Sequence, residues 1–170
     1  VQSIPGGEIY QALASGAIDG AEWIGPFADE RLGFQEVCNF YYTSGFHEPG
    51  SALSVSFNRD IWDSLTPGQQ AMLETAAKAA TQHSLTQGIA NNAAALKRIQ
   101  SQGVKLMEFT DDVWDLFGTA SLKAMDEFMG DPMYAEIRAS FEESMKSSSE
   151  WLQRADNAYV QQRDRVLNRG

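Results

Sequence analysis

Cysteine, basic residues and long apolar runs are all scarce in this sequence, and each scarcity excludes a class of protein. With Cys38 as the only cysteine, the chain can form neither an internal disulfide nor a cysteine-based zinc cluster. Lysine and arginine total 13 against 23 acids, and the resulting net charge of −10 is unsuited to nucleic acids or anionic membrane surfaces. No run approaches the roughly 18 apolar residues of a membrane-spanning helix.

What the sequence does have is the composition of a globular domain. Its 170 residues are 43% hydrophobic and 11% aromatic, which is too apolar for a disordered chain. The chain begins with Val1 rather than methionine, and no basic-then-apolar targeting segment precedes Pro5. We therefore expect the chain to be a piece of a longer protein.

The first third of the chain alternates short helices and short strands. Apolar spacing predicts helices over 8–15 and 27–38, with a short extended run over 21–24 between them. Aromatic residues and an alternating apolar pattern predict strands over 40–43 and 51–57. This alternation is typical of an α/β fold.

Helices dominate from residue 66 onward. A helix is expected to begin here, because Thr66 can be its N-cap and Pro67 suits the first helical position. Gln69 is then the capping-box partner of Thr66. It meets no strong stop before Gly103. A strand over 104–109 and the start of another helix are expected next.

A last helix begins at Pro132 and, if continuous, runs about 35 residues or roughly 50 Å. A compact chain of this size has a radius of gyration near 15 Å, so such a helix spans or overhangs its own domain. Its apolar residues from Ile137 to Val166 follow helical spacing and need a surface to cover them. Either a second subunit or the helix's own lobe can provide that surface.

Glu22 and Trp23 place a carboxylate beside an indole, on an extended run that ends at Gly25 and Pro26. Strand ends of this kind are where α/β proteins place ligand-binding groups. The carboxylate offers two hard oxygen acceptors, and the indole offers a flat wall with one N–H donor. A buried tryptophan beside a solvated glutamate explains the same pattern without any site.

Glu48 is the second candidate acid, in a loop between two expected strands. It precedes Pro49, which extends its backbone, and Gly50 lets the chain turn at once. His47 beside it is only a weak metal signal. If Glu22 and Glu48 converge, their repulsion must be neutralised by a cation, a proton or an arginine. Oxygen ligands favour Na⁺, Ca²⁺ or Mg²⁺ over zinc.

Two other interpretations of Glu22 and Glu48 remain. They can form the acid/base pair of a hydrolase, although the sequence has no nucleophile elbow, no paired histidines at ligand spacing and no phosphate-binding glycine loop. They can also be solvated acids on an acidic helical scaffold or dimerisation module. The residues alone leave these alternatives open.

A series of short motifs runs along the chain in a recognisable order. They are residues 5–13 (PGGEIYQAL), 16–20 (GAIDG), 22–26 (EWIGP), 32–34 (LGF), 41–42 (YY), 47–50 (HEPG) and the helix start at 58–65. In this order they resemble the solute-binding subunit of TRAP transporters, the DctP-like family. The likeness covers essentially the whole chain and is closer to the branch that binds 2-oxo acids, hydroxy acids and related monocarboxylates.

The resemblance implies a two-lobed α/β protein that closes on a small carboxylate, with this chain as its C-terminal half. Residues 1–65 would contribute the cleft and the inter-lobe strands, and residues 66–170 a mainly helical segment with one strand and the long C-terminal helix. The family's carboxylate-clamping arginine belongs to the preceding half, and neither Arg31 nor Arg59 matches it. We therefore expect the chain to carry half a site and to bind substrate poorly alone.

The same resemblance implies a cation that bridges protein and ligand. Glu22 would supply a side-chain oxygen, Trp23 a backbone carbonyl together with its indole wall, and Glu48 a second side-chain oxygen. Phe46 occupies the place of an aromatic pocket residue. The sequence does not distinguish Na⁺ from Ca²⁺.

The implied function is transport without catalysis. The protein would capture a small 2-oxo or hydroxy monocarboxylate in the periplasm and deliver it to the TRAP membrane subunits. The resemblance also implies a homodimer that exchanges C-terminal helices. Sugar alcohols and chloroaromatic acids are alternative ligands within the same branch.

Overall fold

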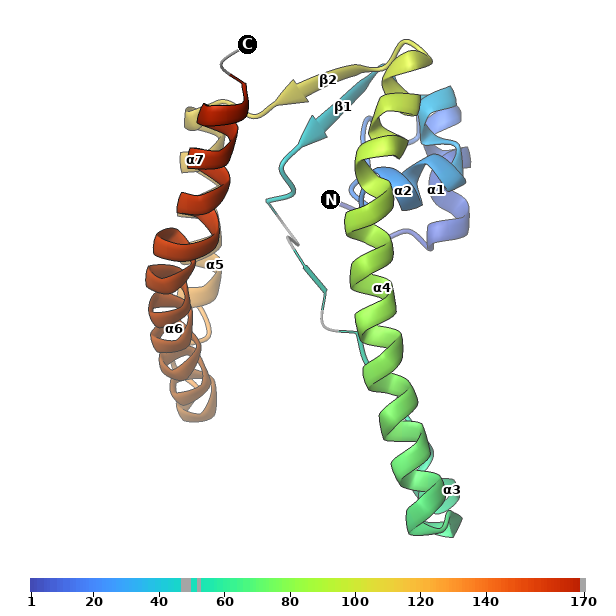
Figure 1. Cartoon of the computed structure of the whole chain (residues 1–170), viewed down its shortest axis with the longest axis vertical. Helices are drawn as coiled ribbons and strands as arrows, with labels where there is room; N and C mark the ends of the chain where they lie inside the picture. Colours follow the sequence, from blue (N-terminus) through green and yellow to red (C-terminus); the bar gives the residue numbers. More distant parts are fainter. Residues whose placement is uncertain (47–49, 52, 169–170) are drawn as a thin grey trace. The chain divides into compact units, whose positions relative to one another are not determined.

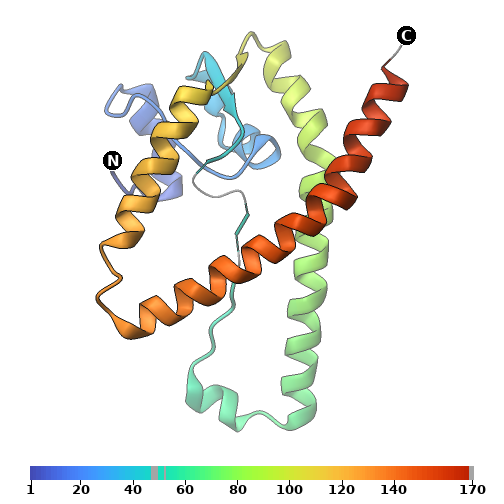
Figure 2. The same cartoon turned by 90° about the vertical axis from the view of Figure 1, so that its left-hand side faces the viewer.

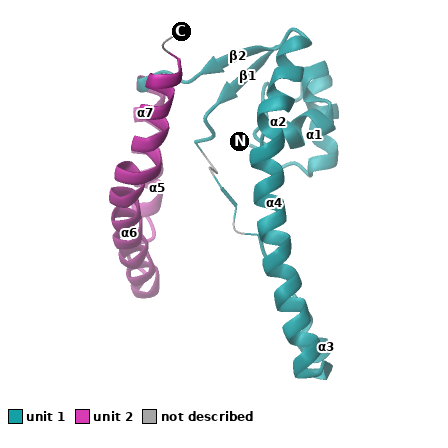
Figure 3. Ribbon diagram, in the orientation of Figure 1, with its two compact units in different colours: residues 1–111 teal, residues 112–170 magenta. Residues whose placement is uncertain are grey.

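Two units, residues 1–111 and 112–170, each pack mainly within themselves in the computed structural model (Figure 3). The structure describes residues 1–46, 50–51 and 53–168. The sequence predicts a different division of the chain, between an α/β segment over 1–65 and a mainly helical segment over 66–170. That division stays a prediction.

A two-stranded parallel sheet joins distant parts of the first unit. Strand β1 (Phe40–Thr43) pairs with β2 (Lys105–Glu108), and Phe40 lies opposite Lys105. Both strands were expected from the sequence. Together with the helices around them they confirm the α/β class, in a helix-rich form with a small parallel sheet.

The strand expected over 51–57 is wrong in its described part, because residues 53–57 pair with no strand in the described part of the chain before α3 (Arg59–Ser64) begins. The short run expected over 21–24 lies in an irregular loop. Leu53 and Val55 are 83% and 72% exposed. An alternating pattern becomes a strand only where a neighbouring strand accepts its hydrogen bonds, and no described segment does so here.

The longest helix of the first unit, α4 (Pro67–Ser101), begins where the sequence predicted. Thr66 Oγ1 accepts from the backbone N–H of Gln69 at 3.3 Å, and Gln69 Oε1 accepts from that of Thr66 at 2.9 Å, which completes the capping box. The buried residues of α4, Ala95 and Ile99, lie toward its C-terminal end. Figures 1 and 2 show β2 following at that end.

Short helical segments form the first part of this unit. They are α1 (Gly6–Ala14), α2 (Pro26–Asp29) and two 3-10 turns, η1 (Glu30–Leu32) and η2 (Phe34–Glu36). The helix expected over 27–38 is therefore broken, because Gly33 takes a left-handed φ of +76° between η1 and η2. Of these segments, α2 packs closely on α4.

Helices make up the second unit. They are α5 (Asp111–Asp126), α6 (Pro132–Leu152), the π-helical turn η3 (Gln153–Asn157) and α7 (Ala158–Leu167). The last three follow one another without a break, so the long helix expected from Pro132 is confirmed. Arg138 of α6 forms an ion pair of 3.0 Å with Asp126 of α5. No helix in the described ranges has the length and apolarity to cross a membrane.

Candidate functional site

The loop that carries Glu22 and Trp23 is held on its C-terminal side by one buried carboxylate. Asp29, at the end of α2, is only 7% exposed. Its Oδ1 accepts hydrogen bonds from the backbone N–H groups of Ile24 at 3.2 Å and Gly25 at 3.0 Å. The backbone that follows Trp23 is therefore tied to α2, which fixes the direction of the loop.

Tyr41 of β1 holds the same carboxylate from its other oxygen. The Tyr41 hydroxyl donates to Asp29 Oδ2 at 2.6 Å. Burial of the phenol, together with this hydrogen bond to Asp29, raises the pKa of Tyr41 well above its ordinary value of 10.0. Asp29 thus receives three hydrogen bonds on its two oxygens, which offsets the cost of burying its charge. The carboxylate links the loop, α2 and the sheet.

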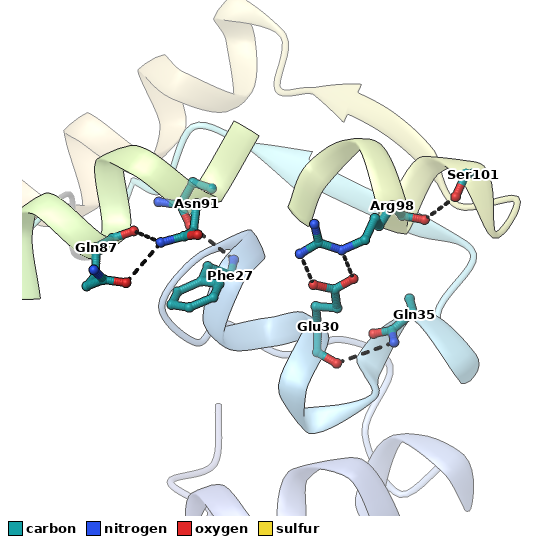
Figure 4. A network of polar contacts seen from close by, with 8 residues as sticks. Phe27, Glu30, Gln35, Gln87, Asn91, Arg98 and Ser101 are labelled. Atoms are coloured by element: carbon teal, nitrogen blue, oxygen red, sulfur yellow. Dashed lines mark hydrogen bonds and ion pairs between the residues drawn. The ribbon is translucent and has the colours of Figure 1, made fainter. Parts of the chain in front are cut away.

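Polar contacts with α4 hold α2 and η1 in place. The backbone N–H of Phe27, in the first turn of α2, donates to Asn92 Oδ1 at 3.0 Å, so a side chain of α4 satisfies a donor of the α2 N-terminus. Arg98 binds both carboxylate oxygens of Glu30 at 2.7 and 2.6 Å, and these hydrogen bonds lower the pKa of Glu30 (Figure 4). Since α2 has only four residues, such contacts rather than helix length keep it ordered.

The indole of Trp23 lies against the first turn of α1. Trp23 is half-buried, and its Cη2 would be 2.5 Å from a Cβ atom added at Gly6. The Tyr10 hydroxyl of α1 donates to Glu36 Oε2 of η2 at 3.0 Å, which ties α1 to the rest of the unit. The indole therefore rests on a fixed support, and the absence of a side chain at Gly6 makes room for it.

The structure places Glu22 and Trp23 on one anchored loop and does not test the remaining site residues. Glu22 is exposed, and Phe46 is half-buried after β1. Glu48, the expected second carboxylate, and its neighbour His47 lie outside the described residues. The convergence of Glu22 with Glu48 and the pocket role of Phe46 therefore stay predictions.

The donors that the loop offers suit a hard cation. The Glu22 carboxylate and the Trp23 carbonyl are both oxygen ligands, which Ca²⁺ and Na⁺ prefer. They do not complete a coordination sphere, because Ca²⁺ takes about six to eight oxygens. Across residues 1–46, 50–51 and 53–168, no three acidic, histidine or cysteine side chains gather as a metal cluster. A cation at this loop needs further oxygen ligands.

Two positioning residues, Asp29 and Asn92, were missed by the sequence analysis. Asp29 follows Pro26 by three residues, which is the place of a first-turn acid in a helix that begins with proline, and this spacing was a usable signal. Asn92 gave no comparable signal, because its partner, the N–H of Phe27, is 65 residues away in the sequence.

Comparisons with known proteins agree on one family. The family described as bacterial extracellular solute-binding protein, family 7, matches residues 1–131. A curated relative, the monocarboxylate 2-oxoacid-binding periplasmic protein of Nostoc sp. (strain PCC 7120), is 40% identical over 127 residues, which are 75% of this chain and 35% of that protein.

Solved structures of TRAP solute-binding proteins share the fold. One from Bordetella bronchiseptica RB50, a mixed-occupancy dimer with copurified calcium and picolinate, has a TM-score of 0.90 and 33% identity, over 99% of this chain and 50% of that one. One from Colwellia psychrerythraea with bound calcium and pyruvate has a TM-score of 0.88 and 33% identity, over 95% and 50%. A third, from Sulfitobacter sp. NAS-14.1, has 24% identity and a TM-score of 0.61 and supports the fold alone.

The chain spans about half the length of the first two of these structures, 50% of each. The family match over residues 1–131 includes the anchored loop, α2, both strands and α4. The sequence resemblance is thereby confirmed. The chain belongs to family 7 of the bacterial extracellular solute-binding proteins, and its fold is that of the solute-binding proteins of TRAP transporters.

Proposed function

We propose that the protein containing this chain captures a small 2-oxo or hydroxy monocarboxylate in the periplasm and holds it through a bridging cation. The observation that carries the proposal is the anchored loop from Glu22 to Gly25, which presents an exposed acid beside a supported indole. The fold around this loop is shared with proteins that hold calcium together with picolinate or pyruvate. The curated relative from Nostoc is named for binding 2-oxoacids.

Each site residue has a distinct role in this proposal. Glu22 and Glu48 supply side-chain oxygens to the cation, and Trp23 supplies its backbone carbonyl and an indole wall. Phe46 adds an aromatic surface to the pocket. The cation neutralises the acids, so that they anchor an anionic ligand instead of repelling it. Calcium is the ion to test first, because the Bordetella and Colwellia structures hold it, and sodium is the alternative.

A cationic partner for the ligand's carboxylate is proposed to come from beyond this chain. Arg98 is paired with Glu30, and the Arg31 guanidinium lies 4.1 Å from the ring centroid of Phe27. Arg59 belongs to α3, away from the loop in the first unit (Figure 1). The chain would therefore hold half of the site. The 170-residue chain alone should bind pyruvate at least about tenfold more weakly than the full gene product, and equal affinity would contradict the half-site idea.

The proposed assembly has two kinds of partner. One is the set of TRAP membrane subunits that receive the solute. The other is a second copy of the protein, because α6, η3 and α7 carry an apolar stripe in which each side chain is at least 46% exposed. The stripe consists of Ile137, Phe141, Met145, Leu152, Tyr159 and Val166.

The mechanism we propose is clamping and release without chemical change of the ligand. Closure is a hinge motion driven by contacts that form only when both lobes meet on the ligand. Turnover of a bound acid would contradict this, as would selective binding of a sugar alcohol. A chloroaromatic acid bound more tightly than pyruvate would correct the ligand class and keep the mechanism.

Calorimetric titration of the full gene product with pyruvate and calcium tests the function. Glu22→Gln removes a charged cation ligand and should weaken binding of both by about tenfold or more. Asp19→Asn is the matched control, because it neutralises an exposed acid three residues earlier in the sequence. Unchanged binding by the Glu22 variant, or no binding of pyruvate or calcium by the unmodified protein, would overturn the proposal.

A further inference from the structure

We infer that Asp29 is a positioning residue for the cation site, because it fixes the direction in which the Trp23 carbonyl points. The inference rests on the proposed function, in which that carbonyl is a cation ligand. Asp29 is not itself a cation ligand, because its carboxylate is buried and already accepts hydrogen bonds from Ile24, Gly25 and Tyr41. It acts through the backbone that it holds.

Peptide geometry carries the effect from Asp29 to the carbonyl. The N–H of Ile24 and the C=O of Trp23 belong to the same planar peptide unit, in which the two groups point in opposite directions when the bond is trans. The bond between Trp23 and Ile24 is trans. The hydrogen bond of 3.2 Å from the Ile24 N–H to Asp29 Oδ1 therefore points the Trp23 oxygen away from the Asp29 carboxylate. Gly25, at 3.0 Å from the same oxygen, fixes the next peptide unit in the same way.

The carboxylate can do this because it is itself immobile. Tyr41 donates to Asp29 Oδ2 at 2.6 Å, and β1, which carries Tyr41, is paired with β2. On the other side, α2 is fixed to α4 through Asn92, which accepts from the N–H of Phe27 at 3.0 Å. A preorganised ligand loses less entropy on binding the ion, so holding the carbonyl in advance raises cation affinity.

Two substitutions at Asp29 separate geometry from charge. Asp29→Asn keeps an oxygen that can accept from Ile24 and Gly25, and its amide can donate to the Tyr41 oxygen, so the peptide stays in place. Asp29→Ala removes the anchor. We expect the alanine variant to lose about 10- to 100-fold in calcium affinity, as outer-shell partners of metal ligands do, and the asparagine variant to retain most of it.

A destabilised control separates positioning from folding. Ile99→Val trims a fully buried side chain of α4 without touching the loop. Calcium titrations are run on the full gene product, with and without pyruvate, at a temperature where thermal melts show every variant to be folded. The Ile99 variant should bind calcium like the unmodified protein despite its lower melting temperature. Tyr41→Phe, which removes one anchor of Asp29, should lose affinity by less than Asp29→Ala.

The outcomes distinguish this inference from the function on which it rests. Calcium and pyruvate binding that depends on Glu22 but is unchanged in Asp29→Ala would leave the function standing and overturn the positioning role. The role would also be overturned if Asp29→Asn lost as much affinity as Asp29→Ala, because charge would then be the cause, or if Ile99→Val lost as much. Failure of the unmodified protein to bind calcium and pyruvate would overturn the function and this inference with it.

Discussion

The indole of Trp23 occupies the space where Gly6 would carry a side chain. A Cβ atom built on Gly6 lies 3.1 Å from Cζ3 of the indole and 2.5 Å from Cη2, and the second distance is closer than carbon atoms can approach without movement. The two residues come from different elements, the candidate loop and the first turn of α1. The indole can therefore lie here only because residue 6 has no side chain.

Gly6→Ala should displace the indole and weaken pyruvate binding by about tenfold, because the wall of the pocket moves. Gly7→Ala is the matched control, since a methyl group at this neighbouring residue of α1 meets nothing within 4 Å. Calorimetry gives the affinities, and tryptophan fluorescence reports the environment of the indole. Equal affinities in the two variants would show that the Gly6 contact does not position the wall.

Asn92→Ala should destabilise the first unit by about 1 kcal/mol, the usual effect of losing a side chain that caps a helix N-terminus. The lost acceptor leaves the N–H of Phe27 without its partner on α4. Asn91→Ala is the control, because Asn91 donates to the carbonyl of Gln87 within the same helix (Figure 4). Urea unfolding measures the free energy of unfolding of both variants. A larger loss for Asn91 than for Asn92 would contradict the role of Asn92 as a cap between helices.

Alkaline pH should weaken the first unit through Tyr41. The pKa of Tyr41 is higher in the folded protein than its unfolded value of 10.0. The neutral phenol therefore contributes its full stabilisation below pH 10.0, and this stabilisation is lost as pH rises toward the folded-state pKa. Tyr41→Phe should therefore show a smaller fall in unfolding free energy between about pH 9 and pH 11. Tyr159→Phe, on the exposed face of α7, is the comparison. If the unfolding free energy of the Tyr41 variant fell with pH as steeply as that of the unmodified protein, Tyr41 would not be the cause of the alkaline destabilisation.

Self-association should depend on the apolar stripe of α6. Phe141→Glu places a charge at a side chain that is 59% exposed and should shift the protein from dimer to monomer in light scattering. Ser147→Glu adds the same charge to an exposed polar position of α6 and should leave the dimer intact. An unmodified protein that stays monomeric at high concentration would contradict the dimer itself.

Local signals in the sequence predicted much of this fold, and contacts between distant residues account for what was missed. The capping box at Thr66, the strand over 40–43 and the helix from Pro132 depend on neighbouring residues, and all three are confirmed. Residues 53–57 have the pattern of a strand, but strand formation requires a partner that no pattern within the segment reveals.

The candidate site also has residues that local sequence reveals and residues that depend on distant contacts. The Glu22–Trp23 pair stands out locally because an acid and an indole precede Gly25 and Pro26. The residues that hold the loop do not stand out, since the partners of Asp29 include Tyr41, 12 residues away, and Phe27 bonds to a side chain 65 residues away. Their function depends on packing, which composition and periodicity do not record.

The most direct test is a crystal structure of the full gene product grown with calcium and pyruvate, with the ion located by its anomalous signal. The account predicts one calcium ion about 2.3–2.6 Å from a carboxylate oxygen of Glu22 and from the backbone oxygen of Trp23. It also predicts that Glu48 and pyruvate coordinate the same ion. Pyruvate bound with no ion at these atoms, or a calcium ion held elsewhere while Glu22 faces solvent, would contradict it.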